Sequence, residues 1–438
     1  MSPVVRFACG PARLLTVSDA RTALANYLFA VRHGGRLILR IDDADADRAK
    51  PDLAENAEQD LRWLGVAWEQ SVRQSARLDR YATAAERLKR AGRLYPCFES
   101  EPELQASRER RLKRGLTPAY DRAMLKLTPT QRATAEASGK RPYWRFLLSG
   151  QTIAWTDLVL GHRRIELRTV SDPVLIRADG LPVQNFRSAV DDLETGITHV
   201  IRRQDRLAGT GVQLDLLAAF GADPAGIAYA HLPTSAGADA GRLDKRPLRS
   251  LRREGVEPAA LANFLLRSAE PHEATIASLD ELAAGLDLAT IPPIAWDATQ
   301  LLALNRGALR HLPFTAVAAR LPAGATEMFW LAVRDAIDLL SEARGWWDVV
   351  AGTIVPPVIE GERELLRIAL DLLPAEPWDE RVWSVWTRAL RETTGRHGQA
   401  LSLPLRLALT GEEQGPELRH LLPLMGRARA ANRLHIAA

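Results

Sequence analysis

The chain has 438 residues, of which 46% are hydrophobic and 26% are charged. This composition is typical of a globular protein with roughly two to four domains, and it excludes a disordered or fibrous chain. The formal net charge of +4 permits an anionic partner such as RNA but does not require one.

Cysteine content and hydropathy exclude further classes. Cys9 and Cys97 are the only cysteines, so a disulfide framework and a cysteine-rich zinc site are both excluded, and we predict no metal. The chain does not open like a secretory signal, and no apolar run approaches the ~18–20 residues that span a bilayer. We therefore expect a cytoplasmic protein with no membrane partner.

The N-terminal part predicts alternating strands and helices. Residues 4–9 predict a buried strand, 18–35 an amphipathic helix that ends at a glycine pair, and 36–42 a second strand. This succession predicts a right-handed βαβ unit, the start of a parallel nucleotide-binding sheet. Two further helical patterns follow over residues 51–70 and 78–98.

The rest of the chain falls into three parts. Residues 98–185 predict a mixed α+β block that is rich in arginine and interrupts the sheet, and 189–233 predict a strand, a helix and a strand that resume it. From about residue 241 the pattern is helical and proline-punctuated. Beyond 310 it is helical throughout, and we expect Trp346, Trp347 and Trp383 to pack cores.

Three long segments carry a family resemblance: RFACGPARLLTVSDARTAL at 6–24, AVDDLETGITHVIRRQD at 189–205 and LSLPLRLALTGEEQGPEL at 401–418. They are similar to RFAPSPTGxLHIGxARTAL, VVDDxxxGITHVIRGED and GKxLxMPLRxALTGxxxGPEL of glutamyl-tRNA synthetases. The resemblance covers nearly the whole chain. It implies an α/β class I Rossmann-like catalytic domain with an α+β insertion, followed by all-helical C-terminal domains. The implied domains are catalytic (1–97 and 186–240), acceptor-binding-like (98–185), connecting and stem-contact-like (241–310) and anticodon-binding-like (311–438).

The first ATP signature of the family has changed. In the family the HIGH tetrapeptide holds the ATP phosphates, and here its positions carry Thr16, Val17, Ser18 and Asp19. A carboxylate at a helix N-terminus competes with phosphate for the free N–H groups and the positive end of the dipole. We therefore expect Asp19 to occupy or repel the phosphate site. Either Ser18 or Asp19 is also a suitable helix N-cap.

The second ATP signature, a KMSKS-type loop, is also altered. The segment RLDKR, residues 242–246, stands where the resemblance places this loop. Arg242 and Asp244 depart from the family pattern, and Asp244 replaces a serine with a negative charge. Lys245 matches the lysine that stabilises pyrophosphate in the family. ATP with Mg²⁺ is thus a possible substrate that both signatures call into question, and we expect no tightly bound cofactor.

The resemblance also implies a glutamate pocket. Arg6 matches the arginine that pairs with the glutamate side-chain carboxylate, Arg202 the one near the α-carboxylate, and Asp42 the acid that contacts the amino group. Guanidinium groups bind carboxylates through two parallel hydrogen bonds, which suits a dicarboxylic amino acid. Ala8, Gln184 and Ser188 stand on other pocket positions, Gln184 in place of a tyrosine. Alternatively, Arg6 and Asp42 form only a buried ion pair.

Three further departures follow Arg202. Arg203, Gln204 and Arg206 replace a usual glycine, glutamate and histidine or aromatic residue of the family. These two arginines raise the positive charge where the sheet ends. Either the three residues form a site for a different acceptor, or the pocket has drifted without selection on its chemistry.

The sequence therefore leaves three functional hypotheses. In the first, the protein is a ligase that joins glutamate to a small-molecule amine instead of tRNA. In the second, it binds tRNA or glutamyl-tRNA without ATP-dependent activation, for glutamyl transfer or in a regulatory role. In the third, it is an active glutamate–tRNA ligase with variant motifs. The expected partners are glutamate, tRNA or glutamyl-tRNA, and a small-molecule acceptor.

Overall fold

The computed structural model describes residues 2–234, 241, 245–267 and 276–438. The chain forms two compact units, one mainly of residues up to 249 with 277–296, and the other mainly of 250–264 with 297–438. Each unit is described separately below. No helix in the described ranges is long and apolar enough to cross a membrane.

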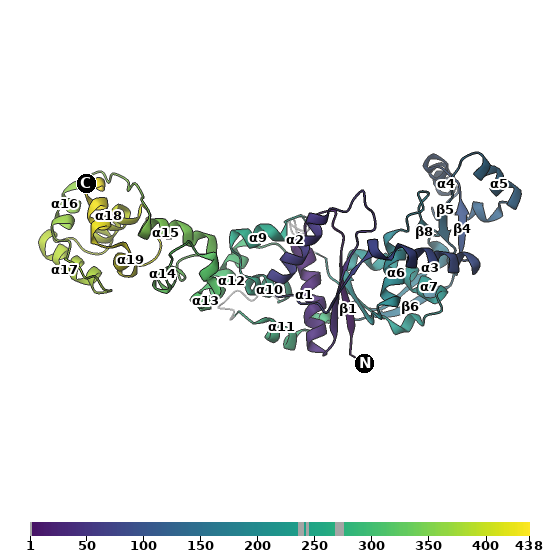
Figure 1. The fold of residues 1–438 in the computed structure, drawn as a ribbon, viewed down its shortest axis with the longest axis horizontal. Coiled ribbons are helices and arrows are strands. Elements are labelled where there is room, and N and C mark those ends of the chain that lie inside the picture. Colours follow the sequence, from purple (N-terminus) through teal and green to yellow (C-terminus); the bar gives the residue numbers. More distant parts are fainter. Residues whose placement is uncertain (1, 235–240, 242–244, 268–275) are drawn as a thin grey trace. The chain divides into compact units, whose positions relative to one another are not determined.

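The first unit is built on a seven-stranded sheet in the order β3-β2-β1-β9-β10-β6-β7 (Figure 1). All neighbouring strands are parallel except β6 and β7, which form an antiparallel hairpin at one edge. The strands span Val4–Cys9 (β1), Arg36–Ile41 (β2), Gln70–Arg73 (β3), Thr152–Asp157 (β6), Gly161–Glu166 (β7), His199–Arg203 (β9) and Ala228–Leu232 (β10). This parallel core confirms the predicted βαβ unit and the Rossmann-like fold.

Helices cover this sheet. Helix α1 packs against β1, β2 and β9, and α11 packs against α1, while α6 contacts both α3 and α7. The helices of this part span Val17–Arg32 (α1), Pro51–Trp63 (α2), Leu78–Arg90 (α3), Gln184–Glu194 (α6), Thr210–Ala219 (α7) and Leu279–Gly285 (α11). The sequence pattern had not predicted α6, and it had extended α2 to residue 70. Helix α2 ends earlier because Gly65 turns the chain in a left-handed conformation (φ 77°).

A second, antiparallel sheet has the order β4-β5-β8, with strands Leu94–Cys97, Tyr143–Phe146 and Val174–Ile176. Two helices accompany it, α4 (Glu101–Lys113) and α5 (Pro129–Ala137). Residues 94–97 were expected in the catalytic domain at the end of a helical pattern, and residues 152–166 were expected in the insertion. The helical expectation for 94–97 is wrong, because α3 ends at Arg90 and these residues form β4. The pairing shows the reverse membership, because β4 joins the small sheet while β6 and β7 extend the large one. The domain boundaries at 97 and 186 themselves stay predictions.

The second unit is helical, as predicted. The helices that follow the sheet region, other than α11, span Leu248–Glu254 (α9), Pro258–Leu266 (α10), Ala298–His311 (α12), Phe314–Val317 (α13), Glu327–Val333 (α14), Ala343–Ala351 (α15), Arg363–Asp371 (α16), Val382–Thr394 (α17), Gln399–Thr410 (α18), Leu418–Met425 (α19) and Arg427–Ala437 (α20). Its core is centred on the fully buried Trp330 and Trp386. The side chains of Trp346, Trp347 and Trp383 pack against this core, which confirms their predicted structural role.

Trp386 also carries a hydrogen bond inside this core. Its indole N–H donates to the backbone oxygen of Ala369 at 3.0 Å, a carbonyl in the last turn of α16. We expect Trp386→Phe to lower the free energy of unfolding by about 1–2 kcal/mol, because it leaves a buried carbonyl unpaired and opens a small cavity. Urea unfolding followed by far-UV circular dichroism measures this. The half-buried Trp383→Phe is the matched control, and an equal loss in both variants would contradict the expectation.

Candidate active site

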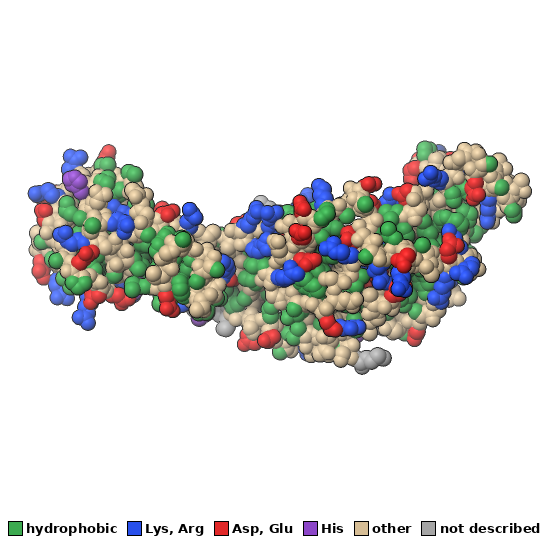
Figure 2. Space-filling view, in the orientation of Figure 1, with side chains coloured by type: hydrophobic (Ala, Val, Ile, Leu, Met, Phe, Trp, Pro, Cys, Tyr) green, Lys and Arg blue, Asp and Glu red, His purple; other side chains and the backbone are tan. Residues whose placement is uncertain are grey.

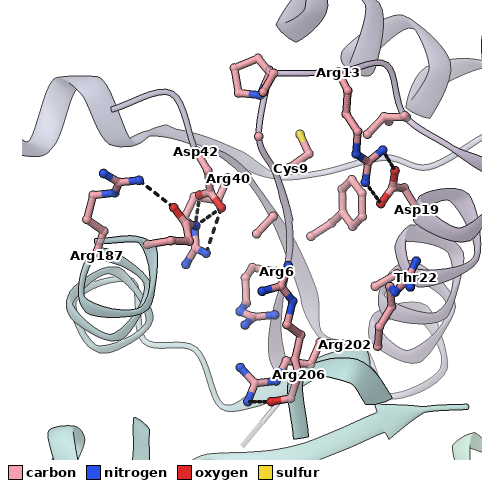
Figure 3. A pocket seen from close by; sticks show the side chains of 18 of the residues that line it. Arg6, Cys9, Arg13, Asp19, Thr22, Arg40, Asp42, Arg187, Arg202 and Arg206 are labelled. Atoms are coloured by element: carbon pink, nitrogen blue, oxygen red, sulfur yellow. Dashed lines mark hydrogen bonds and ion pairs between the residues drawn. The ribbon is translucent and has the colours of Figure 1, made fainter. Parts of the chain in front are cut away.

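A cavity of about 630 Å³ opens at the carboxyl ends of β1, β2 and β9 (Figure 3). Strand β1 lies between β2 and β9. The connections that follow β1 and β9 therefore run to opposite sides of β1, toward β2 and toward β10. Open parallel sheets bind ligands at such a switch point. The cavity brings together eight residues of the predicted site: Arg6, Ala8, Asp19, Asp42, Gln184, Arg202, Arg203 and Arg206. Ser188, Gln204 and residues 16–18 are not among its lining residues.

Arg6 on β1 presents an anion-binding edge to this cavity. Its Nε donates to Asp192 Oδ1 at 3.1 Å, and its side chain is buried. The two terminal nitrogens of Arg6 have no hydrogen-bond partner within the described ranges, although the residue lines the cavity. Since a guanidinium presents donors in a planar fork, this edge can bind a carboxylate.

Asp42 is held by neighbours other than Arg6. Arg40 donates from Nε to Asp42 Oδ1 at 2.7 Å and from Nη1 to Asp192 Oδ1 at 3.0 Å. The alternative that Arg6 and Asp42 form only a buried ion pair is therefore wrong, because both Arg6 and Arg40 bind Asp192, and Arg40 is the arginine that binds Asp42. Burial raises the pKa of Asp42, and the charge of Arg40 opposes this shift. The sequence interpretation missed both Arg40 and Asp192.

Two of the predicted pocket positions, Gln184 and Ser188, contact the Arg40–Asp42 pair. The Gln184 amide donates to Asp42 Oδ2, and Ser188 Oγ accepts from Arg40 Nη2 at 2.8 Å. Both residues lie on α6, the helix that the sequence pattern did not predict. Gln184 thus lines the cavity and binds the acid, whereas Ser188 lies behind it and orients Arg40.

Arg202, in β9 near its end, is bound through all three of its nitrogens. Its Nε donates to His231 Nε2 at 3.0 Å, Nη1 to Gln213 Oε1 at 2.8 Å and Nη2 to Thr210 Oγ1 at 2.9 Å. Burial lowers the pKa of this guanidinium to about 10. The position of Arg202 is therefore fixed, and Arg6 keeps the more available donors.

His231 fixes Arg202 only in one protonation state. Its Nε2 accepts from Arg202, so its Nδ1 must carry the proton that it donates to the buried Asp157. Burial lowers the pKa of His231, and Asp157 opposes the shift. His231 lies in β10, within the predicted strand–helix–strand segment 189–233, but its contact with Arg202 was not predicted.

Because His231 is neutral in the folded protein, we expect the stability of the fold to decrease in acid. Below the ordinary histidine pKa of about 6.5, the unfolded chain takes up a proton that folded His231 does not, so stability falls as the pH falls. We expect His231→Asn to reduce the loss of unfolding free energy between about pH 7 and pH 5. Urea unfolding at both pH values measures this loss of unfolding free energy. The exposed His162→Asn on β7 should keep the wild-type slope, and an unchanged slope in His231→Asn would refute the assignment.

The N-terminus of α1 is closed by its own side chains. Thr16 is the N-cap, and its N and Oγ1 donate to Asp19 Oδ2 at 2.8 and 2.9 Å. The expectation that Ser18 or Asp19 is the N-cap is wrong, because the helix begins at Val17 and places Asp19 at the third position of a capping box. The Val17 N–H donates to the Arg246 carbonyl at 3.1 Å.

Arg13 completes this closure. Its two terminal nitrogens lie 2.6 and 3.1 Å from the carboxylate oxygens of Asp19, and both residues line the cavity (Figure 3). Arg13 stands at the glycine of the RFAPSPTG motif. Asp19 already pairs with a guanidinium and with the first helical turn, so the described residues at this helix terminus do not fit ATP phosphates in the way that the family pattern holds them.

The remaining predicted positions are placed as follows. Arg203 and Arg206 line the cavity, with side-chain nitrogens 3.3 and 3.9 Å from the Asp205 carboxylate. Asp205, which the sequence interpretation missed, thus offsets part of their charge. Lys245 is exposed and does not line the cavity, although the neighbouring Leu248 N–H donates to the Leu15 carbonyl at 2.8 Å. The predicted positions Arg242 and Asp244 lie outside the described residues.

Comparison with known families decides the relationship. Residues 3–289 match the model described as tRNA synthetases class I (E and Q), catalytic domain. The chain belongs to this class I tRNA synthetase family. Residues 358–438 of this synthetase-family chain also match a model described as an anticodon binding domain. The predicted resemblance is therefore confirmed.

Relatives of this synthetase-family chain match it from end to end. It is 54% identical to "Glutamate--tRNA ligase 2" of Granulibacter bethesdensis, over 99% of this chain and 98% of the relative. It is also 54% identical to "Glutamate--tRNA ligase 2" of Acidiphilium cryptum, over 99% of both. A solved glutamate tRNA ligase from Elizabethkingia meningosepticum has the same fold, with a TM-score of 0.81, 24% identity and coverage of 100% of this chain and 99% of that one.

Proposed function

We propose that this protein binds glutamate in the cavity and tRNA through its helical part, and that it does not activate glutamate with ATP. It is then a glutamate- and tRNA-binding member of a ligase family that has lost the first chemical step of that family. The observation that carries the loss is the Arg13–Asp19 pair at the N-terminus of α1.

Support for glutamate comes from the charges around the cavity. Arg6 offers two terminal nitrogens for one carboxylate, and Asp42 offers an acceptor for an ammonium group within the same cavity. Asp42 already accepts from Arg40 and Gln184, but a carboxylate has room for further donors. The relatives named above are glutamate–tRNA ligases by name.

Support for tRNA comes from the C-terminal part. The match to an anticodon binding domain extends over residues 358–438, and relatives that carry the tRNA ligase name cover 99% of this chain. A protein that had changed only to small-molecule substrates would have no use for this region. Retention of the whole helical part therefore favours a tRNA partner.

The argument against ATP is electrostatic. The N-terminus of a helix attracts phosphate through free N–H groups and the dipole, but Asp19 is itself an anion at this position. A triphosphate entering here must displace Arg13 from Asp19 or lie against a carboxylate. Each alternative costs binding energy that the synthetase reaction needs for the transition state.

The test is a reaction of the purified protein with ATP, Mg²⁺ and labelled glutamate, with and without total tRNA. We expect no AMP and no charged tRNA, together with saturable binding of glutamate and of tRNA in separate titrations. Charged tRNA would refute the proposal and establish an ordinary glutamate–tRNA ligase.

Formation of AMP without charged tRNA would also refute the proposal, in favour of ligation to a small-molecule amine near Arg203, Gln204 and Arg206. The pairing of both arginines with Asp205 lowers the net charge available there for such an acceptor. For this reason we rank binding without activation above the altered ligation.

A further inference from the structure

Two arginines that line the cavity, Arg6 and Arg202, differ in how many of their donors are already bound. Arg202 donates to four acceptors within the protein: His231 Nε2, Gln213 Oε1, Thr210 Oγ1 and the Arg206 carbonyl. A guanidinium has five N–H groups, so within the described residues one N–H of Arg202 remains for a ligand. Arg6 donates only to Asp192 in the part of the chain that the structure describes, and it keeps both terminal nitrogens for a ligand.

The remaining N–H of Arg202 suits a carbonyl oxygen better than a carboxylate. A carboxylate bound through two parallel hydrogen bonds needs two neighbouring N–H groups, which Arg202 offers only if one of its acceptors is displaced. Three of these acceptor side chains are buried: Thr210, His231 and Gln213. Leaving one of them unpaired costs about 1–3 kcal/mol, whereas the carbonyl oxygen of an ester or amide needs one donor and displaces nothing.

Six further arginines line the cavity as far as the chain is described, and they do not replace Arg202. Three are held by acceptors within the protein: Arg13, Arg40 and Arg187. The other three are at least partly exposed: Arg48, Arg203 and Arg206. Figure 2 shows Asp and Glu side chains interspersed with Lys and Arg on the visible face of the first unit. Exposed charges in such a mixture contribute roughly 0–1 kcal/mol each, because water and salt screen them.

We propose that the cavity selects glutamyl compounds whose α-carboxyl group is uncharged, as an ester or an amide, over free glutamate. Arg6 then binds the side-chain carboxylate, Asp42 binds the α-ammonium group, and the remaining N–H of Arg202 donates to the α-carbonyl oxygen. Free glutamate brings a second carboxylate, which this arrangement does not pair. The selection depends on the proposed function, because it uses the same binding of the glutamate side chain and amine.

The test is calorimetric titration of the full-length protein with L-glutamate, its α-methyl ester, its α-amide and glutamine, which is its γ-amide. We expect the α-ester and the α-amide to bind at least about tenfold tighter than glutamate at about pH 6.5, where the amines remain largely protonated. Glutamine should bind more weakly than glutamate, because it lacks the carboxylate that Arg6 pairs. The tighter ligand of the α-ester and the α-amide identifies the natural linkage.

The matched variant is Gln213→Leu. It removes the acceptor of Arg202 Nη1 and so frees a second N–H on this guanidinium. We expect the ratio of the affinity for glutamate to that for the α-amide to rise about tenfold. Gln151→Leu, at an exposed position of the same unit, is the control and should keep the wild-type ratio. Thermal unfolding of both variants separates loss of binding from loss of fold.

Two results would overturn the inference and leave the proposed function standing. In the first, wild type binds free glutamate as tightly as the α-ester and the α-amide, or tighter. In the second, a folded Gln213→Leu keeps the wild-type ratio, so the occupied donors of Arg202 do not set the preference. Failure of wild type to bind any of the four compounds would instead refute the proposed function.

Discussion

Restoring the family motif at the N-terminus of α1 is expected to create ATP binding. The variant replaces Arg13 by glycine and Thr16–Asp19 by His-Ile-Gly-His, which removes the internal ion pair and returns the phosphate donors. Each hydrogen bond to a charged phosphate contributes about 1.5–3 kcal/mol to binding, so the change is large enough to measure. We expect ATP affinity to rise at least about 100-fold, as measured by calorimetric titration with Mg²⁺.

The matched control changes the same ion pair without rebuilding the site. In Arg13→Ala the Asp19 carboxylate stays on the helix terminus and loses its cation, so ATP affinity should not exceed that of wild type. Equal ATP affinity in wild type and the restored variant, with both folded, would show that the Arg13–Asp19 pair does not control nucleotide binding. Tight binding of ATP by wild type would refute the closure directly.

Much of the fold was predictable because it depends on local pattern. The alternation of strand and helix over residues 4–42 follows from hydrophobic period and glycine stops, and the structure confirms it. The membership of β6 and β7 was not predictable in the same way. Their alternation identifies strands, but the sheet that a strand joins depends on contacts far away in the chain, such as Tyr229 with Asp157.

The site was predictable where a single residue type carries the chemistry. Arg6, Asp42 and Arg202 match motif positions, and all three line one cavity. Their partners could not be read from the sequence, because Asp192 is distant from Arg6 in the chain and because either Arg6 or Arg40 could have bound Asp42. Only the geometry distinguishes Arg40, which binds Asp42, from Arg6, which binds Asp192.

The closure at α1 shows the limit of motif comparison. The loss of HIGH was visible, and the anionic effect of Asp19 followed from the helix dipole. The contact of Arg13 with Asp19 could not be predicted from the sequence, because a guanidinium six residues earlier could equally have pointed into solvent. The structure pairs Arg13 with Asp19, so an ion pair lies at the helix terminus where the family motif is missing.

Glutamate binding is expected to depend on Arg6. In Arg6→Met the cavity loses the only terminal guanidinium edge that we assign to the substrate carboxylate, while Asp192 keeps Arg40 at 3.0 Å and so remains paired. Two charge-assisted hydrogen bonds are lost, each contributing about 1.5–3 kcal/mol, so we expect glutamate affinity to fall about 100-fold or more in a calorimetric titration.

Two variants separate this assignment from a general effect of charge. Arg6→Lys keeps the charge but not the planar fork, so its affinity should lie between those of wild type and Arg6→Met. Arg36→Met removes an arginine at the amino end of β2, whereas the cavity opens at the carboxyl ends of the strands. This variant should leave glutamate affinity unchanged. Equal losses in Arg6→Met and Arg36→Met would reflect net charge alone. Undiminished binding by a folded Arg6→Met would show that the carboxylate lies elsewhere, and since Arg202 is already bound through all three nitrogens, the glutamate assignment of the cavity would then be wrong.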